Sequence, residues 1–139
     1  VEMEIDISEA RVLIVDDTPD NIKLLGSFLK PEGYRLNIAQ NGKQALDVVN
    51  RVKPDLILLD VMMPVLDGHE TCKQLKSSPE TENIPVIFLT GKTEIDDIIK
   101  GFELGAVDYL AKPVIQKELL VRVKNHLELK MAKDKLAQI

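Results

Sequence analysis

Acidic, hydroxyl and ammonium side chains follow short apolar runs at widely separated points of the sequence. Asp16 and Asp17 follow one such run, Asp60 follows another, and Thr90 and Lys112 follow two more. Neighbouring carboxylates repel each other and raise each other's pKa values unless a cation offsets their charge. Mg²⁺ prefers oxygen ligands from one or two carboxylates, waters and phosphate groups, so it is the cation that such a set predicts.

The order of these residues suggests which of them would coordinate Mg²⁺. Asp17 and Asp60 are the natural direct ligands, and Asp16 binds the ion directly or through a water molecule. The backbone carbonyl of Met62, just past Asp60, would complete the protein's contribution, and Mn²⁺ is a possible substitute for Mg²⁺. Lys112 would offset the remaining negative charge and hold a phosphoryl oxygen as a point charge.

A carboxylate held beside Mg²⁺ can attack phosphorus and form an aspartyl phosphate. Asp60 is the candidate nucleophile, because it lies between the other acids and the pair formed by Thr90 and Lys112. That pair would donate hydrogen bonds to the phosphoryl oxygens as charge develops on them. The residues therefore predict Mg²⁺-dependent transfer of a phosphoryl group to Asp60.

The apolar runs indicate the elements that must position these side chains. Unbroken runs of branched aliphatic residues are typical of strands buried on both faces of a parallel sheet. The strongest runs are 12–15, 56–59 and 86–89, and weaker candidates are 35–39 and 107–111. Each run precedes one of the polar positions or a turn, as expected when a site lies at the carboxyl ends of the strands.

Helical periodicity and helix-start signals fill the segments between the runs. Capping residues, acidic or amide partners three residues later, and a proline at the first helical position mark the starts. The predicted starts are Thr18–Pro19, Asn41 with Gln44, Asp67 with Glu70, Thr93 with Asp96, and a position near Ile115. Five alternations of strand and helix predict an α/β domain with helices on both faces of a parallel sheet.

Four pieces of the sequence together resemble the receiver domain of two-component response regulators. They are VLIVDD at 12–17, DVMMP at 60–64 with Asp67–Gly68, LTG at 89–91, and DYLAKP at 108–113. The resemblance covers residues 11–125, between an N-terminal extension (1–10) and an extension of the last helix (126–139). It implies a flavodoxin-like (βα)5 doubly wound sheet with strand order 2-1-3-4-5, for which a receiver is itself a standard example, and an extended C-terminal helix.

The resemblance gives each polar residue of the predicted site a role. The roles are phosphoryl acceptor for Asp60, Mg²⁺-binding pair for Asp16 and Asp17, switch hydroxyl for Thr90, phosphate-binding lysine for Lys112, and switch aromatic for Tyr109. It also implies a cis bond before Pro113, which would turn the preceding lysine into the crevice. Gly91 stands where alanine is frequent, and Met62 and Lys92 occupy positions expected to tune dephosphorylation.

The implied function is a phosphorylation switch, not a metabolic enzyme. A histidine kinase or a histidine phosphotransfer protein would supply the phosphoryl group, and the surface of the fourth helix, fifth strand and fifth helix would change. Apolar residues recur along the last helix at Leu129, Ala132, Leu136 and Ile139. This seam predicts a connector to an output domain or a homodimer contact through the helix, with a frayed tail as the alternative.

Composition excludes several classes of protein. Eighteen basic and 23 acidic residues give a net charge of -5, which disfavours direct binding to nucleic acid. A single cysteine, Cys72, cannot form an internal disulfide and is expected to pack on its helix, while His69 and His126 are expected to be exposed. There is no apolar run of ~20 residues and no secretory signal, so we expect a cytoplasmic protein.

Two other functions stay open on the sequence alone. A phosphohydrolase that forms an aspartyl phosphate usually has a second acid two residues after the nucleophile, where this chain has Met62. A flavin or nucleotide binder would use the same crevice, but no glycine-rich loop follows the first strand. Asp16 and Asp17, taken alone, also fit a simple turn and helix cap.

Overall fold

A parallel β-sheet with helices on both faces forms the protein in a computed structural model that describes residues 5–91 and 95–138. The strands pair in the order β2-β1-β3-β4-β5, and every pairing is parallel. This is the predicted flavodoxin-like order. The elements are β1 (Arg11–Val15), α1 (Pro19–Leu29), the 3₁₀ turn η1 (Lys30–Glu32), β2 (Arg35–Ala39), α2 (Gly42–Val52), β3 (Leu56–Asp60), α3 (Gly68–Lys76), β4 (Val86–Thr90), α4 (Ile95–Glu103), β5 (Asp108–Ala111) and α5 (Gln116–Ala137).

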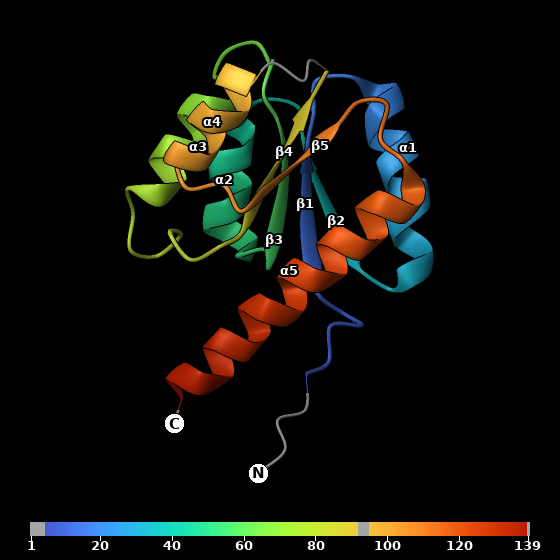
Figure 1. Cartoon of the computed structure of the whole chain (residues 1–139), viewed down its shortest axis with the longest axis vertical. Helices are drawn as coiled ribbons and strands as arrows, with labels where there is room; N and C mark the ends of the chain where they lie inside the picture. Colours follow the sequence, from blue (N-terminus) through green and yellow to red (C-terminus); the bar gives the residue numbers. More distant parts are fainter. Residues whose placement is uncertain (1–4, 92–94, 139) are drawn as a thin grey trace.

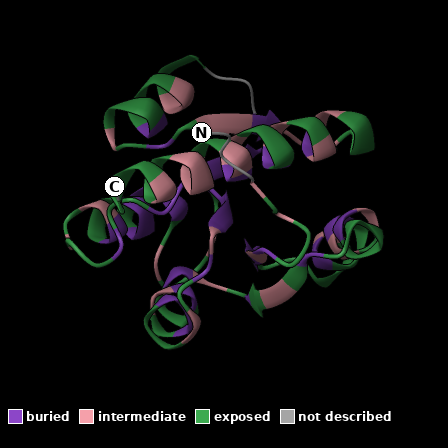
Figure 2. Cartoon of the chain, turned by 90° about the horizontal axis from the view of Figure 1, so that it is seen from below, coloured by how far each residue is buried: buried purple, intermediate pink, exposed green. Residues whose placement is uncertain are grey.

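The sheet separates two apolar layers, and alternate residues of each strand enter opposite layers. Val12 and Ile14 of β1 pack with α1 and α5, whereas Leu13 and Val15 pack with α2 and α3. All residues of β3 and β4 are buried, which explains why these strands are unbroken apolar runs in the sequence. Figure 1 shows α1 and α5 on one side of the sheet, and Figure 2 shows the buried strands between the helical layers.

The predicted caps begin α2 and α3. The side chain of Asn41 accepts a hydrogen bond from the backbone N–H of Gln44, and Asp67 does the same for Glu70. Thr18 is the N-cap of α1 and precedes Pro19, but its side chain forms no capping bond. The predicted start at Thr93 lies outside the described residues.

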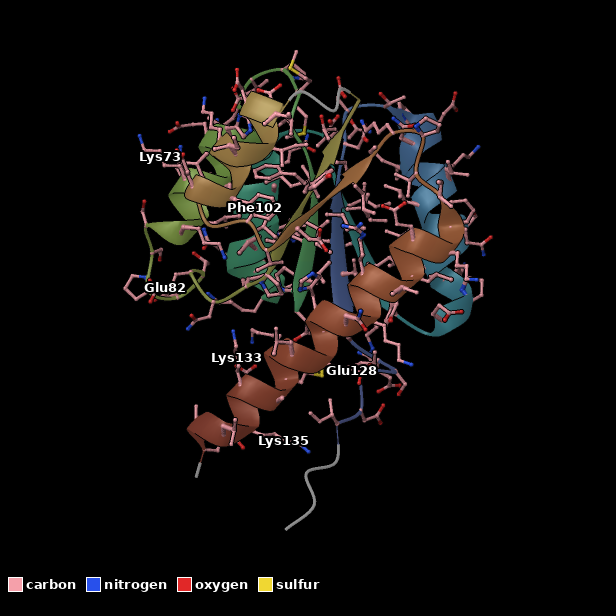
Figure 3. The ribbon with its side chains drawn as sticks, in the orientation of Figure 1. Lys73, Glu82, Phe102, Glu128, Lys133 and Lys135 are labelled. Atoms are coloured by element: carbon pink, nitrogen blue, oxygen red, sulfur yellow. The ribbon has the colours of Figure 1, made fainter. Side chains whose placement is uncertain are left out.

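Helix α5 is longer than the sheet is tall. Its buried residues are Leu119, Val123 and Leu127, and Met131 packs against the same cluster. The remaining turns project past the end of the sheet opposite to the strand arrowheads (Figure 1), and Figure 3 shows Lys133 and Lys135 on this part. Among the described helices, none combines the length and the apolar composition that crossing a membrane requires.

Both histidines differ from the prediction that they are exposed. His69, in the first turn of α3, is only 8% exposed, and its ring meets the ring of Phe88 edge to face with centroids 5.3 Å apart. The side chain of His126 in α5 is 19% exposed, and Nε2 lies 3.0 Å from Oδ2 of Asp108. The sequence pattern shows that both residues are helical, but it does not show which side of each helix packs on the sheet.

Candidate functional site

The carboxyl ends of four strands carry the polar residues of the predicted site. Asp16 follows β1, Asp60 is the last residue of β3, Thr90 is the last residue of β4, and Lys112 follows β5. Because the strands are parallel, these ends meet at one edge of the sheet. One carboxylate oxygen each of Asp16, Asp17 and Asp60 lie within 4.8 Å of one another.

Lys112 joins two of these carboxylates. Its Nζ lies 3.0 Å from Oδ2 of Asp16 and 3.0 Å from Oδ2 of Asp60. The backbone N–H of Lys112 donates to the carbonyl of Thr90 at 2.7 Å, which continues the pairing of β4 and β5 to this residue. The bond between Lys112 and Pro113 is cis, as the resemblance implies.

Asp60 is a buried carboxylate with few compensating partners. It is 4% exposed, and burial raises the pKa of the Asp60 carboxyl above its ordinary value, while Lys112 opposes the rise. The backbone N–H of Met62 donates to Oδ1 at 3.3 Å, which brings the backbone of Met62 to the site. A buried carboxylate is well suited to attack an electrophile once a cation is present.

The charges around Lys112 hold it in the protonated form. Burial alone lowers the pKa of the Lys112 ammonium, but hydrogen bonds and charge interactions with Asp16 and Asp60 outweigh burial and raise the pKa above its ordinary value. Asp16 is fully buried, and its Oδ1 accepts the backbone N–H of Thr18 at 2.9 Å. Asp17 is exposed at the mouth of the crevice.

The start of α3 lies directly against the backbone of the acceptor strand. Gly68 donates its N–H to the carbonyl of Val61 at 2.9 Å. A Cβ at Gly68 would lie 2.2 Å from the backbone oxygen of Asp60. Glycine is therefore required here because the helix approaches the strand more closely than any side chain allows.

Thr90 and Tyr109 lie on the side of the site that faces α4. Thr90 is 6% exposed, and a cavity of about 10 Å³ lies between this residue, Phe102 and Tyr109. The rings of Phe102 and Tyr109 meet edge to face with centroids 6.2 Å apart. Figure 3 shows Phe102 on α4 beside β5. Lys92, expected to tune dephosphorylation, lies outside the described residues.

Three residues near the site escaped the sequence reasoning. Asp108, at the start of β5, contacts both Arg122 and His126 of α5, and Arg122 also contacts Tyr109. Arg122 and His126 are four residues apart, so they share one face of a helix, and this spacing is the signal that could have grouped them. Their common partner on β5 depends on the tertiary fold.

The donor set fits a hard divalent cation. Among the described residues, three carboxylates face the ammonium of Lys112 at this edge of the sheet, so these groups keep an excess of negative charge. Two of the oxygens belong to neighbouring residues of the segment after β1 and the third to the last residue of β3, and Asp17 is the exposed member of the cluster. Carboxylate oxygens around an open position are what Mg²⁺ uses when it also binds water and phosphate.

Known proteins have similar sequences. Residues 12–124 match the model of the response regulator receiver domain. A Vibrio cholerae protein named "Probable cyclic di-GMP phosphodiesterase" is 49% identical over 93% of this chain and 29% of its own length. The response regulator PleD of Caulobacter vibrioides is 43% identical over 93% of this chain and 28% of its own length. The chain thus spans under a third of these relatives.

Solved structures of receiver domains and response regulators have folds similar to that of this chain. The receiver domain of the Pseudomonas aeruginosa sensor histidine kinase PA1611, with a magnesium ion in its active-site cleft, is 30% identical. It superimposes with a TM-score of 0.80 over 86% of this chain and 98% of that one. The chemotaxis response regulator CheY4 of Vibrio cholerae is 30% identical, with a TM-score of 0.80 over 85% of this chain. The chain belongs to the response regulator receiver domain family of two-component signalling systems.

Proposed function

We propose that Asp60 is the phosphoryl acceptor of this receiver domain. The observation that carries the proposal is the position of its carboxylate, which is buried at the end of the central strand β3 and held 3.0 Å from Lys112. Asp16 and Asp17 lie within 4.8 Å of it. Asp16 also contacts Lys112 but follows β1, and Asp17 is exposed, so Asp60 is the member of the cluster that ends the central strand β3.

In the proposed step, a carboxylate oxygen of Asp60 forms a bond to phosphorus. The bond between phosphorus and a nitrogen of a phosphohistidine breaks, and the leaving imidazole keeps the electron pair and then takes a proton from water. Lys112 holds one phosphoryl oxygen through its ammonium, and the hydroxyl of Thr90 donates to another. The donor is a histidine kinase or a histidine phosphotransfer protein.

Asp16, Asp17, Asp60 and the backbone carbonyl of Met62 would hold Mg²⁺, with Mn²⁺ as a possible substitute. When bound, the cation neutralises charge on the carboxylates and on the phosphoryl oxygens. Without a cation, the carboxylates would repel an incoming phosphate group. The excess of three carboxylates over the ammonium of Lys112, counted over the described residues, is the observation that supports this assignment.

Phosphorylation would change the surface formed by α4, β5 and α5. The phosphoryl group adds a charge of about -1.5 to -2 and new acceptors beside Thr90. Movement of Thr90 toward that group would enlarge the adjacent cavity for Tyr109. The shift is a change in the populations of two states, limited by how differently each state contacts the phosphoryl group.

The chain would act as a switch that catalyses only its own phosphorylation and slow dephosphorylation, in the cytoplasm. The activity in the name of the Vibrio cholerae relative does not transfer, because this chain spans 29% of that protein. A connector from α5 to a separate output domain fits the projecting turns of the helix. The exposed apolar residues of α4 and α5 also suggest a homodimer, formed through α5 or through the face of α4, β5 and α5.

Intact mass spectrometry after incubation with acetyl phosphate tests the proposal. Wild type should gain one phosphoryl group with Mg²⁺ and none with EDTA. Asp60→Asn should gain none under either condition, whereas Asp55→Asn, a matched control at the other end of β3, should behave as wild type. Labelling of Asp60→Asn would contradict the assignment, and turnover of a generic phosphate ester by wild type would favour a phosphohydrolase.

A further inference from the structure

Asp108 at the start of β5 is bound by two side chains of α5. Nη1 of Arg122 donates to Oδ1 of Asp108 and to the backbone oxygen of Tyr109, the latter at 3.0 Å. Nε2 of His126 lies 3.0 Å from Oδ2 of Asp108. Oδ1 also accepts the backbone N–H of Tyr109 at 2.8 Å. Asp108, Arg122 and His126 are here called the β5–α5 clamp.

The clamp also reaches the ring of Tyr109. The guanidinium carbon of Arg122 lies 5.9 Å from the centroid of this ring, within the range of a cation–π contact. Phe102 of α4 meets the same ring edge to face. Tyr109 is therefore held from α5 by Arg122, through both its ring and its backbone, while α4 contacts it through Phe102.

The space beside Thr90 does not accept the ring in this conformation. Tyr109, Phe102 and Thr90 all line the cavity, whose volume of about 10 Å³ corresponds to a single water molecule. We call the observed position of the Tyr109 ring outward and a position in the space beside Thr90 inward. The inward position requires the cavity to grow and the ring to leave the guanidinium of Arg122. The contacts of Arg122 thus favour the outward position.

We propose that Arg122 is a positioning residue that holds Tyr109 outward and thereby sets the fraction of unphosphorylated molecules in the switched conformation. The inference rests on the proposed function, in which Asp60 accepts the phosphoryl group and Tyr109 follows Thr90. Loss of the contact with the ring raises the free energy of the outward state alone, because the inward ring no longer touches Arg122. The population of the inward state must then rise.

Fluorine NMR of protein labelled with 3-fluorotyrosine measures the position of the ring directly. The chain has two tyrosines, and Tyr34, 8% exposed among core residues of the α1 and α5 layer, provides an internal reference. In unphosphorylated Arg122→Gln, the Tyr109 resonance should move toward its position in phosphorylated wild type. The Tyr34 resonance should stay in place.

The acetyl phosphate concentration needed for half-labelling is a second readout. A purely structural role of Arg122 would not lower this concentration when the residue is replaced. Arg122→Gln should reach half-labelling by acetyl phosphate at a concentration about two- to fivefold lower than wild type, the factor expected from a partly exposed ion pair. Glu118→Gln is the matched control. It removes the Glu118 carboxylate 3.2 Å from Nη2 of Arg122 but leaves the contacts with Tyr109, so both readouts should remain as in wild type.

Arg122→Lys provides a second variant if Arg122→Gln does not fold. Lysine keeps the charge but cannot contact Asp108, the Tyr109 carbonyl and the ring together, so both readouts should change in the same direction. An unchanged Tyr109 resonance or an unchanged half-labelling concentration, with Asp60 still phosphorylated, would overturn the role of Arg122. Wild type that takes up no phosphoryl group would instead overturn the proposed function, and this role with it.

Discussion

Asp60 combines two requirements that conflict. A nucleophile must be ionised, but burial at the end of β3 disfavours the ionised form, and Lys112 compensates only in part. The carboxylate therefore destabilises the metal-free fold at neutral pH. Functional sites commonly retain such destabilising groups, because removing them would remove the chemistry.

Asp60→Asn should stabilise the metal-free protein at pH 7 by about 1 kcal/mol, the usual size of a single-site effect. Because the pKa of Asp60 is raised above its ordinary 3.8, the native state binds more protons than the unfolded state above this pH. The contribution of Asp60 to the stability of the wild type should then fall as the pH rises from 3.8 through the raised pKa. Asparagine at this position does not titrate. The stability difference should be smallest at acid pH and largest near neutrality.

Urea denaturation in EDTA across this pH range measures the difference. Asp17→Asn is the matched control, because Asp17 is exposed and its charge is already solvated. A constant difference between wild type and Asp60→Asn at all pH values would contradict the account of Asp60 as a buried, destabilising charge.

Residue types and strand ends were enough to predict which polar side chains meet in the crevice. The chain order places Asp16, Asp60 and Lys112 after apolar runs, and parallel pairing brings those ends together. Arg122 and His126 were not predicted as partners of Asp108, because a helical pattern does not define the rotation of α5 against β5. Burial of His69 was missed for the same reason.

At the scale of elements, local capping interactions predict the starts of most helices, but they do not predict how far along its length α5 contributes to the core. Asn41 and Asp67 cap their helices through hydrogen bonds within four residues, so the sequence alone contains that information. The core contribution of α5 continues to Leu127, beyond residue 124 where the family match ends. Its extent depends on contacts with α1, β3 and β5, of which α1 and β3 are distant in sequence.

A chain that ends at residue 125 should be less stable than one that ends at residue 132. The shorter chain loses Leu127, which is fully buried, and Met131, which packs on the same cluster. Loss of one large core side chain typically costs about 2–5 kcal/mol. The longer chain keeps both residues and should match the full chain.

Chemical denaturation of the two shortened chains and the full chain gives the comparison. Leu127→Ala in the full chain separates the lost side chain from the lost helical turns and should reproduce most of the effect. Equal stability of all three chains would show that the core ends before Leu127.

At the scale of the whole molecule, the site exists only when the fold is complete. Its residues are spread from Asp16 to Lys112, and they converge through the order of the sheet. A ligand that binds this native cluster and not the unfolded chain must stabilise the entire domain. The fold class and strand order follow from sequence pattern and resemblance, whereas the choice of partner depends on surface side chains, which that pattern does not assign.

Mg²⁺ should therefore raise the thermal unfolding temperature of the wild type. At a concentration 100 times its dissociation constant, the gain is about 2.7 kcal/mol. Asp17→Asn should lose much of this gain while keeping its metal-free stability, because Asp17 is exposed but belongs to the carboxylate cluster. Differential scanning calorimetry with Mg²⁺, and with NaCl at equal ionic strength, makes the measurement. An equal shift with NaCl would show screening and not a site.

The crevice and the projecting turns of α5 lie at opposite ends of the sheet (Figure 1). A domain joined directly to the end of this helix begins far from the acceptor site, so α5 can pass the change to it without contact with the phosphoryl group. Different output domains can then be joined to one receiver domain without a change in its acceptor site. The length of the connecting helix sets the orientation of the joined domain, because each added residue turns that domain by about 100° around the helix axis.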